Sequence, residues 1–199
     1  MEIPVYKMEL DPNEPKLGMK IMSMVDAPAI MVNWVKFKDS NQVKFAIDSE
    51  EQRIVFAPAL IPDMPIYRNM GGKEFYLTID AQTIQETAIK FAKDNLNNNL
   101  DINHDGNVIG DVTIFESFIT SPNRVQSAKG FEELPIGTWF IAAKVNNDEV
   151  WNKIKAGELN GFSIDALFSF KKAESVDTID VDKTIDQILN SKIVLSIIK

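Results

Sequence analysis

His104 is the only imidazole in a chain of 199 residues that contains no cysteine. Without cysteine there is no disulfide, no thiolate metal site and no cysteine nucleophile. A single histidine also excludes multi-histidine metal centres and any catalytic group that takes two imidazoles from one chain. Histidine-dependent catalysis within this chain therefore has to use His104. A catalytic role for His104 in turn requires a nucleophile with which it can pair.

Ser163 is the best candidate for that nucleophile. It lies in a segment, residues 162–170, in which apolar and polar residues alternate, and Gly161 before it permits a close approach of the backbone. The pattern Gly161-x-Ser163-x-Asp165 differs from the Gly-x-Ser-x-Gly nucleophile elbow, which excludes an α/β-hydrolase. Most serines on strands are structural, so a catalytic role for Ser163 requires His104 beside it.

Glu116 is a carboxylate in an alternating segment, on the same expected face as Val112, Ile114 and Phe118. A carboxylate on an apolar face is unfavourable unless it is paired. Two alternatives follow: Glu116 faces solvent at a sheet edge, or it has a dedicated partner. An imidazole, Arg124 or a lysine could be that partner.

The segment Asp101-Ile-Asn-His-Asp-Gly106 matches the opening of an EF-hand calcium loop. The bidentate glutamate that such a loop needs at its twelfth position is replaced by Val112. A turn rich in Asp and Asn is therefore the favoured interpretation, with Asp101, Asn103 and Asp105 as the alternative ligands of a loosely held hard cation. We expect neither a metal nor a cofactor.

Hydrophobic periodicity predicts the elements that must position these residues. Alternation predicts strands over residues 75–79, 112–120, 137–145 and 162–170. Helical spacing predicts one helix that begins after Asp80 and a shorter one that begins after Asn147. We expect one α+β domain over residues 1–172, followed by an acidic connector and a C-terminal helix over residues 173–199.

The charge balance narrows the classes of partner. With 21 basic and 29 acidic side chains the formal net charge is −8, which argues against a nucleic-acid binder. No apolar run approaches the roughly 20 residues that span a bilayer. The first residues lack the pattern of a secretory signal. We expect a soluble protein of a cytoplasm.

Several short blocks, in order along residues 1–170, resemble the XkdF-like phage serine proteases. They are the segments 23–30, 32–37, 58–68, 103–106 and 116–119, and the longer stretch from Gly137 to Ile164. The resemblance implies a prohead (capsid maturation) protease with a fold like that of herpesvirus assemblin. We therefore expect a mostly antiparallel β-sheet or barrel core flanked by a few helices.

The resemblance also implies roles and partners. Ser163 would be the nucleophile and His104 the general base. The herpesvirus enzymes use a second histidine as the third member, which this chain lacks, so a carboxylate has to take that place or the place is empty. We favour Glu116, with Asp165 as the alternative.

The substrates would be phage scaffold and major capsid proteins, cut inside the procapsid in the host cytoplasm. A homo-oligomer is compatible with this assignment. The competing hypothesis is a catalytically inactive assembly protein of the virion with the same fold.

Overall fold

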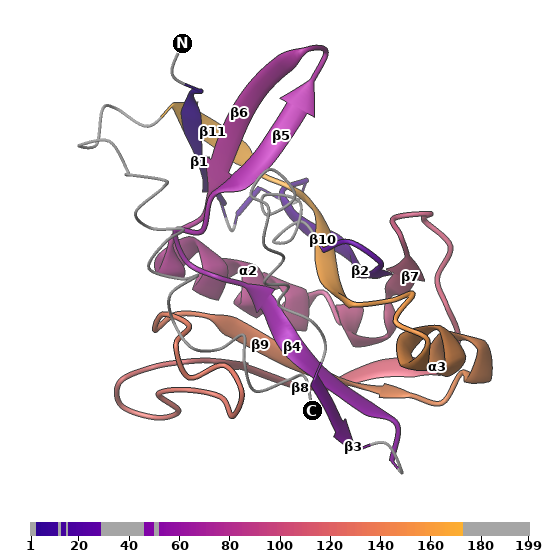
Figure 1. Ribbon diagram of the computed structural model, residues 1–199. Coiled ribbons are helices and arrows are strands. Elements are labelled where there is room, and N and C mark those ends of the chain that lie inside the picture. Colours follow the sequence, from indigo (N-terminus) through magenta and orange to yellow (C-terminus); the bar gives the residue numbers. More distant parts are fainter. Residues whose placement is uncertain (1–2, 12, 15, 29–45, 50–51, 173–199) are drawn as a thin grey trace.

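The computed structural model describes residues 3–11, 13–14, 16–28, 46–49 and 52–172. These residues form three β-sheets, two α-helices and one 3-10 turn (Figure 1). The expected connector and C-terminal helix, residues 173–199, lie outside the described residues. The strands are β1 (Val5–Glu9), β2 (Gly18–Val25), β3 (Ala46–Ser49), β4 (Ile54–Leu60), β5 (Ile66–Met70), β6 (Lys73–Thr78), β7 (Leu100–Ile102), β8 (Val112–Ile119), β9 (Trp139–Val145), β10 (Gly161–Leu167) and β11 (Ser169–Lys172).

The smallest sheet has three strands in the order β10-β2-β7. β10 is antiparallel to β2, and β7 is parallel to it. Met22, Met24 and Leu100 are fully buried in the core. Because successive side chains of a strand point to opposite faces, Ser23 lies on the other face, between the two methionines in sequence.

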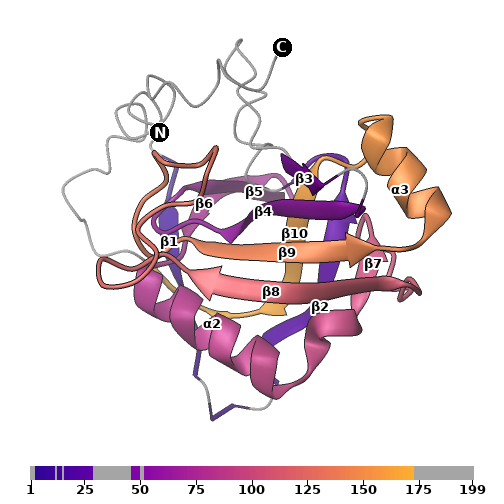
Figure 2. The same cartoon turned by 90° about the horizontal axis from the view of Figure 1, so that it is seen from below.

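The second sheet has the order β3-β4-β9-β8 and is antiparallel throughout. Figure 2 shows its strands crossing in front of β10 and β2. β9 is buried along almost its whole length because apolar residues fill both of its faces. An aromatic cluster covers one side of this sheet: Phe56 stacks on Phe140 and Phe118 with ring centroids 5.2 and 6.0 Å apart, and Phe131 packs against Phe140.

The third sheet has the order β11-β1-β6-β5, in which β1 and β6 are parallel and the other pairs antiparallel. The β5–β6 hairpin projects from the body of the molecule (Figure 1). The single strand expected over residues 162–170 is divided at Phe168, so that β10 and β11 belong to different sheets. Phe168 itself is buried, which anchors the chain where it leaves one sheet for the other.

The two helices follow the sequence prediction closely. α2 (Ala81–Lys93) begins after Asp80, whose carboxylate accepts the Thr83 N–H at 2.7 Å. It contacts both β2 and β9, and Phe91 packs edge-on against Trp139. α3 (Asp148–Lys155) begins after Asn147, whose side chain accepts the Val150 N–H at 3.1 Å. α2 thus joins two of the sheets from one side.

The described chain corrects one part of the expected fold class. It is mostly β with two α-helices, as expected, but the three sheets remain separate and do not close into a barrel. Among the described strands, each sheet begins and ends with a strand that pairs on one side only, whereas a barrel closes by pairing its first strand with its last. Neither helix is long and apolar enough to span a bilayer in the part of the chain described.

Candidate active site

His104 lies in the turn that follows β7. Its backbone and that of Asn103 are left-handed, with φ of +59° and +51°. Histidine and asparagine tolerate this region better than most residues, but two in succession persist only where the surroundings hold them. Here the Asn103 N–H donates to the Met24 carbonyl at 3.1 Å, and the Asn103 side chain accepts the Asp26 N–H at 3.0 Å. The end of β2 therefore fixes the position of the imidazole.

Three polar residues form one row across the three-stranded sheet. Ser163 of β10 is paired in register with Ser23 of β2, and Ser23 with Asp101 of β7. Residues directly opposite one another on neighbouring strands point to the same face. Ser163 is 8% exposed, and Ser23 and Asp101 are fully buried. The sheet thus places two hydroxyls and a carboxylate side by side, beneath the turn that carries His104.

The imidazole bridges the two hydroxyls. His104 Nε2 lies 3.0 Å from Ser163 Oγ, and His104 Nδ1 lies 2.8 Å from Ser23 Oγ. Both distances are those of hydrogen bonds. When the proton is on Nδ1, that N–H donates to Ser23 and the bare Nε2 accepts the Ser163 hydroxyl. This is the arrangement in which a base and an orienting group act on a serine.

Asp101 is the buried carboxylate of the row. Its Oδ2 accepts the Gly106 N–H at 2.8 Å, which closes the turn around His104. Its Oδ1 is buried and has no hydrogen-bond partner among the described residues. A carboxylate oxygen in that state is costly unless it takes part in a function or meets a partner absent here.

The calcium alternative finds no support in this turn. Asn103 and Asp105 use their side-chain oxygens as acceptors for the N–H groups of Asp26 and Asn107. Within the described ranges, no group of three histidine, aspartate or glutamate side chains is arranged to hold a metal ion. The hydrogen bonds are those of a turn rich in Asp and Asn.

The structure does not bring Glu116 to His104. Glu116 is exposed on β8, an edge strand of the four-stranded sheet. A shift of register between Ile114 and Glu116 interrupts the alternation that placed Glu116 on an apolar face. Of the two alternatives open for this residue, the described structure matches the one in which it faces solvent at a sheet edge.

Asp165 lies closer to the bridged pair. It is exposed on β10 and lines a shallow hollow together with Ser163, His104 and Arg68. A third catalytic residue would contact His104 Nδ1, and that atom is hydrogen-bonded to Ser23. Arg68 was not singled out from the sequence.

Ser23 was also missed by sequence reasoning about site residues. Two signals were present: it is the one polar residue between the buried Met22 and Met24, and it opens the segment 23–30 that carries part of the family resemblance. Neither signal names its partner, because that partner is 81 positions away in the chain.

Comparison with known proteins identifies one family. No curated protein and no solved structure matches the chain. One family does match, under the description "Putative phage serine protease XkdF", over residues 42–171. That range contains His104 and Ser163 but not Ser23. Since that range covers more than half of the chain, this protein belongs to the family of that description, the XkdF family.

Proposed function

We propose that the protein is a serine endopeptidase in which Ser163 is the nucleophile and His104 the general base. The observation that carries the proposal is the pair of hydrogen bonds on opposite nitrogens of the one histidine, 3.0 Å to Ser163 and 2.8 Å to Ser23. Membership of a family described as phage serine proteases supports the same reaction.

The reaction uses atoms that already lie in hydrogen-bond reach. Ser163 Oγ attacks the carbonyl carbon of the scissile peptide bond while its proton passes to His104 Nε2. That proton then moves to the leaving nitrogen as the C–N bond breaks, which leaves an acyl-serine. Water attacks the acyl carbon, gives a proton to Nε2, and the proton returns to Ser163 Oγ as the acid is released.

Ser23 orients the base in this scheme, in the place that the sequence had suggested for Glu116 or Asp165. By accepting the Nδ1–H it keeps Nε2 unprotonated and directed at Ser163. Asp101 adds a buried negative charge one strand away, which favours the imidazolium that forms during attack.

The proposed substrates are the scaffold and major capsid proteins of a phage head, cut inside the procapsid during maturation. The support for this setting is the family, which is a phage family. The competing proposal is an inactive assembly protein, and the observation in its favour is that a hydroxyl stands where a charged or imidazole group usually supports the base.

A fluorophosphonate probe tests the chemistry without knowledge of the substrate, because it reacts with activated serines. We expect labelling of the full chain at Ser163, located by peptide mapping, and its loss in Ser163→Ala and His104→Ala. Ser169→Ala is the matched control, since Ser169 lies on β11 and its hydroxyl donates to the Glu9 carbonyl. Labelling that persists in His104→Ala would contradict the mechanism.

Co-expression with the scaffold and capsid proteins of the same phage tests the biological setting. Mass spectrometry should find cleaved products with the wild-type chain, and the rate should fall by roughly four to six orders of magnitude in Ser163→Ala. An unlabelled wild-type chain that also cuts nothing would favour the inactive assembly protein.

A further inference from the structure

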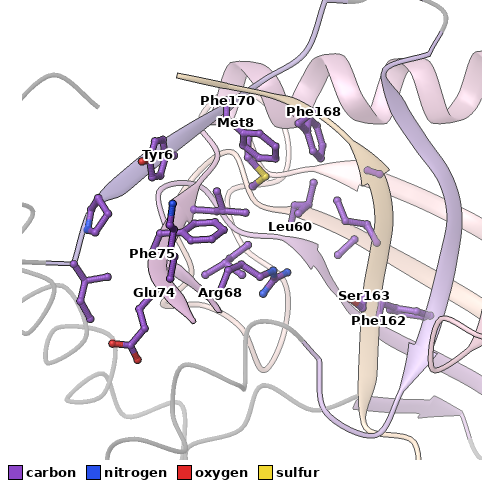
Figure 3. Close-up of a pocket in the computed structure, with 18 of the residues that line it drawn as sticks. Tyr6, Met8, Leu60, Arg68, Glu74, Phe75, Phe162, Ser163, Phe168 and Phe170 are labelled. Carbon is purple, nitrogen blue, oxygen red and sulfur yellow. The ribbon is translucent and has the colours of Figure 1, made fainter. Parts of the chain in front are cut away.

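A groove of about 990 Å³ begins at Ser163 and extends away from His104. Figure 3 shows it between β10 on one side and β1 with the β5–β6 hairpin on the other. A cavity of this size accommodates several side chains of a bound molecule. Since Ser163 lies at its edge, whatever occupies the groove is held beside the nucleophile.

The wall away from Ser163 is aromatic. Tyr6 and Phe75 meet edge-to-face with ring centroids 5.8 Å apart, and Phe168 and Phe170 lie across from them on the chain that leaves β10 (Figure 3). Phe170 is 58% exposed although it lines the groove. Exposed aromatic surface gathered around a concavity marks a binding site for an apolar group.

Arg68 stands between this aromatic wall and the nucleophile. It extends from β5 toward β10 and lines both the groove and the hollow with His104 and Ser163 (Figure 3). The guanidinium is half-buried, and that burial lowers the pKa of Arg68 from its ordinary value. Its Nη1 donates a hydrogen bond to the neighbouring Tyr67 carbonyl at 2.9 Å. Among the described residues, no carboxylate pairs with it.

The other charges of the groove do not neutralise Arg68. Glu74 and Lys73 line the same groove on β6, and Glu74 accepts a hydrogen bond from Tyr67. Asp165 shares the hollow with Arg68 but is exposed to solvent. A half-buried guanidinium without an acidic partner gains most from a ligand carboxylate, which it can bind through two parallel hydrogen bonds.

The backbone of β10 supplies a third element of recognition. Phe162, Ile164 and Ala166, which are alternate residues of β10 and share one of its faces, line the groove together with Ser163. One face of β10 therefore forms this wall of the groove. In the sheet described, β10 pairs on one side, with β2. An extended polypeptide can add to such an edge through main-chain hydrogen bonds.

We propose that the groove binds an extended polypeptide that carries a large apolar side chain and, near it, a carboxylate side chain. The apolar side chain packs between Phe75 and Phe170, and the carboxylate pairs with Arg68. The inference rests on the proposed protease function, because it makes the bound segment the substrate that is presented to Ser163.

Binding to an inactive chain tests the inference without catalysis. A randomised decapeptide library is passed over the immobilised Ser163→Ala protein, and the retained peptides are sequenced by mass spectrometry. We expect large apolar residues at one position and Asp or Glu at a neighbouring one to be enriched by about tenfold, the size typical of one well-filled apolar subsite. A retained pool without these preferences would overturn the proposal.

Matched variants of the same inactive chain assign each preference. Phe170→Ala should abolish the apolar enrichment, while Phe115→Ala should leave it, since Phe115 is equally exposed at 56% but lies on β8. Arg68→Gln should abolish the acidic enrichment, Arg68→Lys should restore part of it, and Arg124→Gln should not affect it. Preferences that survive Phe170→Ala and Arg68→Gln would contradict the assignment.

The outcomes separate this inference from the proposed function. A chain that selects apolar–acidic peptides but is not labelled by fluorophosphonate would keep the binding groove and exclude the protease. A chain that is labelled and cuts head proteins but shows no such selectivity would keep the protease and exclude the groove.

Discussion

The three-stranded and four-stranded sheets differ in the kind of side chain that they gather on one face. The three-stranded sheet buries a polar row of Ser163, Ser23 and Asp101 on one face. The four-stranded sheet gathers Phe56, Phe118 and Phe140 into a ring cluster and leaves Glu116 of its edge strand β8 in solvent. Buried polar groups stabilise a fold weakly unless all are satisfied, whereas buried aromatic surface stabilises it strongly. In the proposed mechanism the three-stranded sheet therefore supplies the reacting groups, while the aromatic cluster of the four-stranded sheet mainly supplies stability.

Removing a ring from the aromatic cluster should produce the largest effect. Phe140 is fully buried and packs against both Phe56 and Phe118, which also contact each other. Phe140→Ala should lower the free energy of unfolding by about 3–5 kcal/mol, because the truncation leaves a cavity in the four-stranded sheet. Chemical denaturation measures this. Phe115→Ala, a truncation of an exposed ring on the same sheet, should change it by less than about 0.5 kcal/mol, and equal losses would contradict the idea that the buried ring cluster stabilises this sheet.

Removing the hydroxyl of Ser23 should give the next largest effect, on rate instead of stability. Ser23→Ala should lower kcat about 100-fold with little change in KM, because the base loses its orientation while the substrate site is untouched. Ser117→Ala on β8 is the control: its hydroxyl accepts the Trp139 indole N–H at 2.9 Å, far from the chemistry. A Ser23→Ala enzyme with wild-type kcat would remove Ser23 from the mechanism.

The sequence contains enough to predict the helices and the proposed reacting pair, but not the buried polar residues beside that pair. Asp80 and Asn147 mark helix starts by local chemistry, which needs no knowledge of the rest of the chain. His104 and Ser163 follow from the count of histidines and the family resemblance. Ser23 and Asp101 lie beside this pair because of the register of the strands, and that register is set by packing between segments far apart in sequence. The prediction that Glu116 shares a face with Val112 and Ile114 was wrong for a related reason. The register shift inside β8 depends on tertiary pairing and cannot be read from local alternation.

Helix α2 joins the two sheets, so weakening its start should give a moderate, pH-dependent loss of stability. Burial alone would raise the pKa of Asp80, but hydrogen bonds from Lys7 and Thr83 outweigh it and hold the pKa of that carboxyl below its ordinary value. A depressed pKa gives stability that is complete above the unfolded value of about 3.9 and is lost as the pH falls through the folded value. Asp80→Ala should therefore cost about 1 kcal/mol at pH 7 and progressively less in acid.

Thermal unfolding between pH 2 and 7 measures that difference. Asp80→Asn is the informative control, because asparagine retains the helix cap but loses the ion pair with Lys7, which is 2.6 Å long and partly exposed. A gap between wild type and Asp80→Ala that widens in acid would show that Asp80 does not stabilise the fold as a carboxylate.

The smallest effect should come from the two carboxylates that the sequence suggested as partners of His104. Glu116→Gln should change the cleavage rate less than about twofold and the free energy of unfolding by less than about 0.5 kcal/mol, because Glu116 is exposed on the structural sheet. Asp165→Asn is the sharper comparison, since Asp165 lines the hollow that holds His104 and Ser163. A loss in either variant as large as that of Ser23→Ala would return the orienting role to a carboxylate. A loss confined to Ser23→Ala would assign that role to the hydroxyl of the buried polar row.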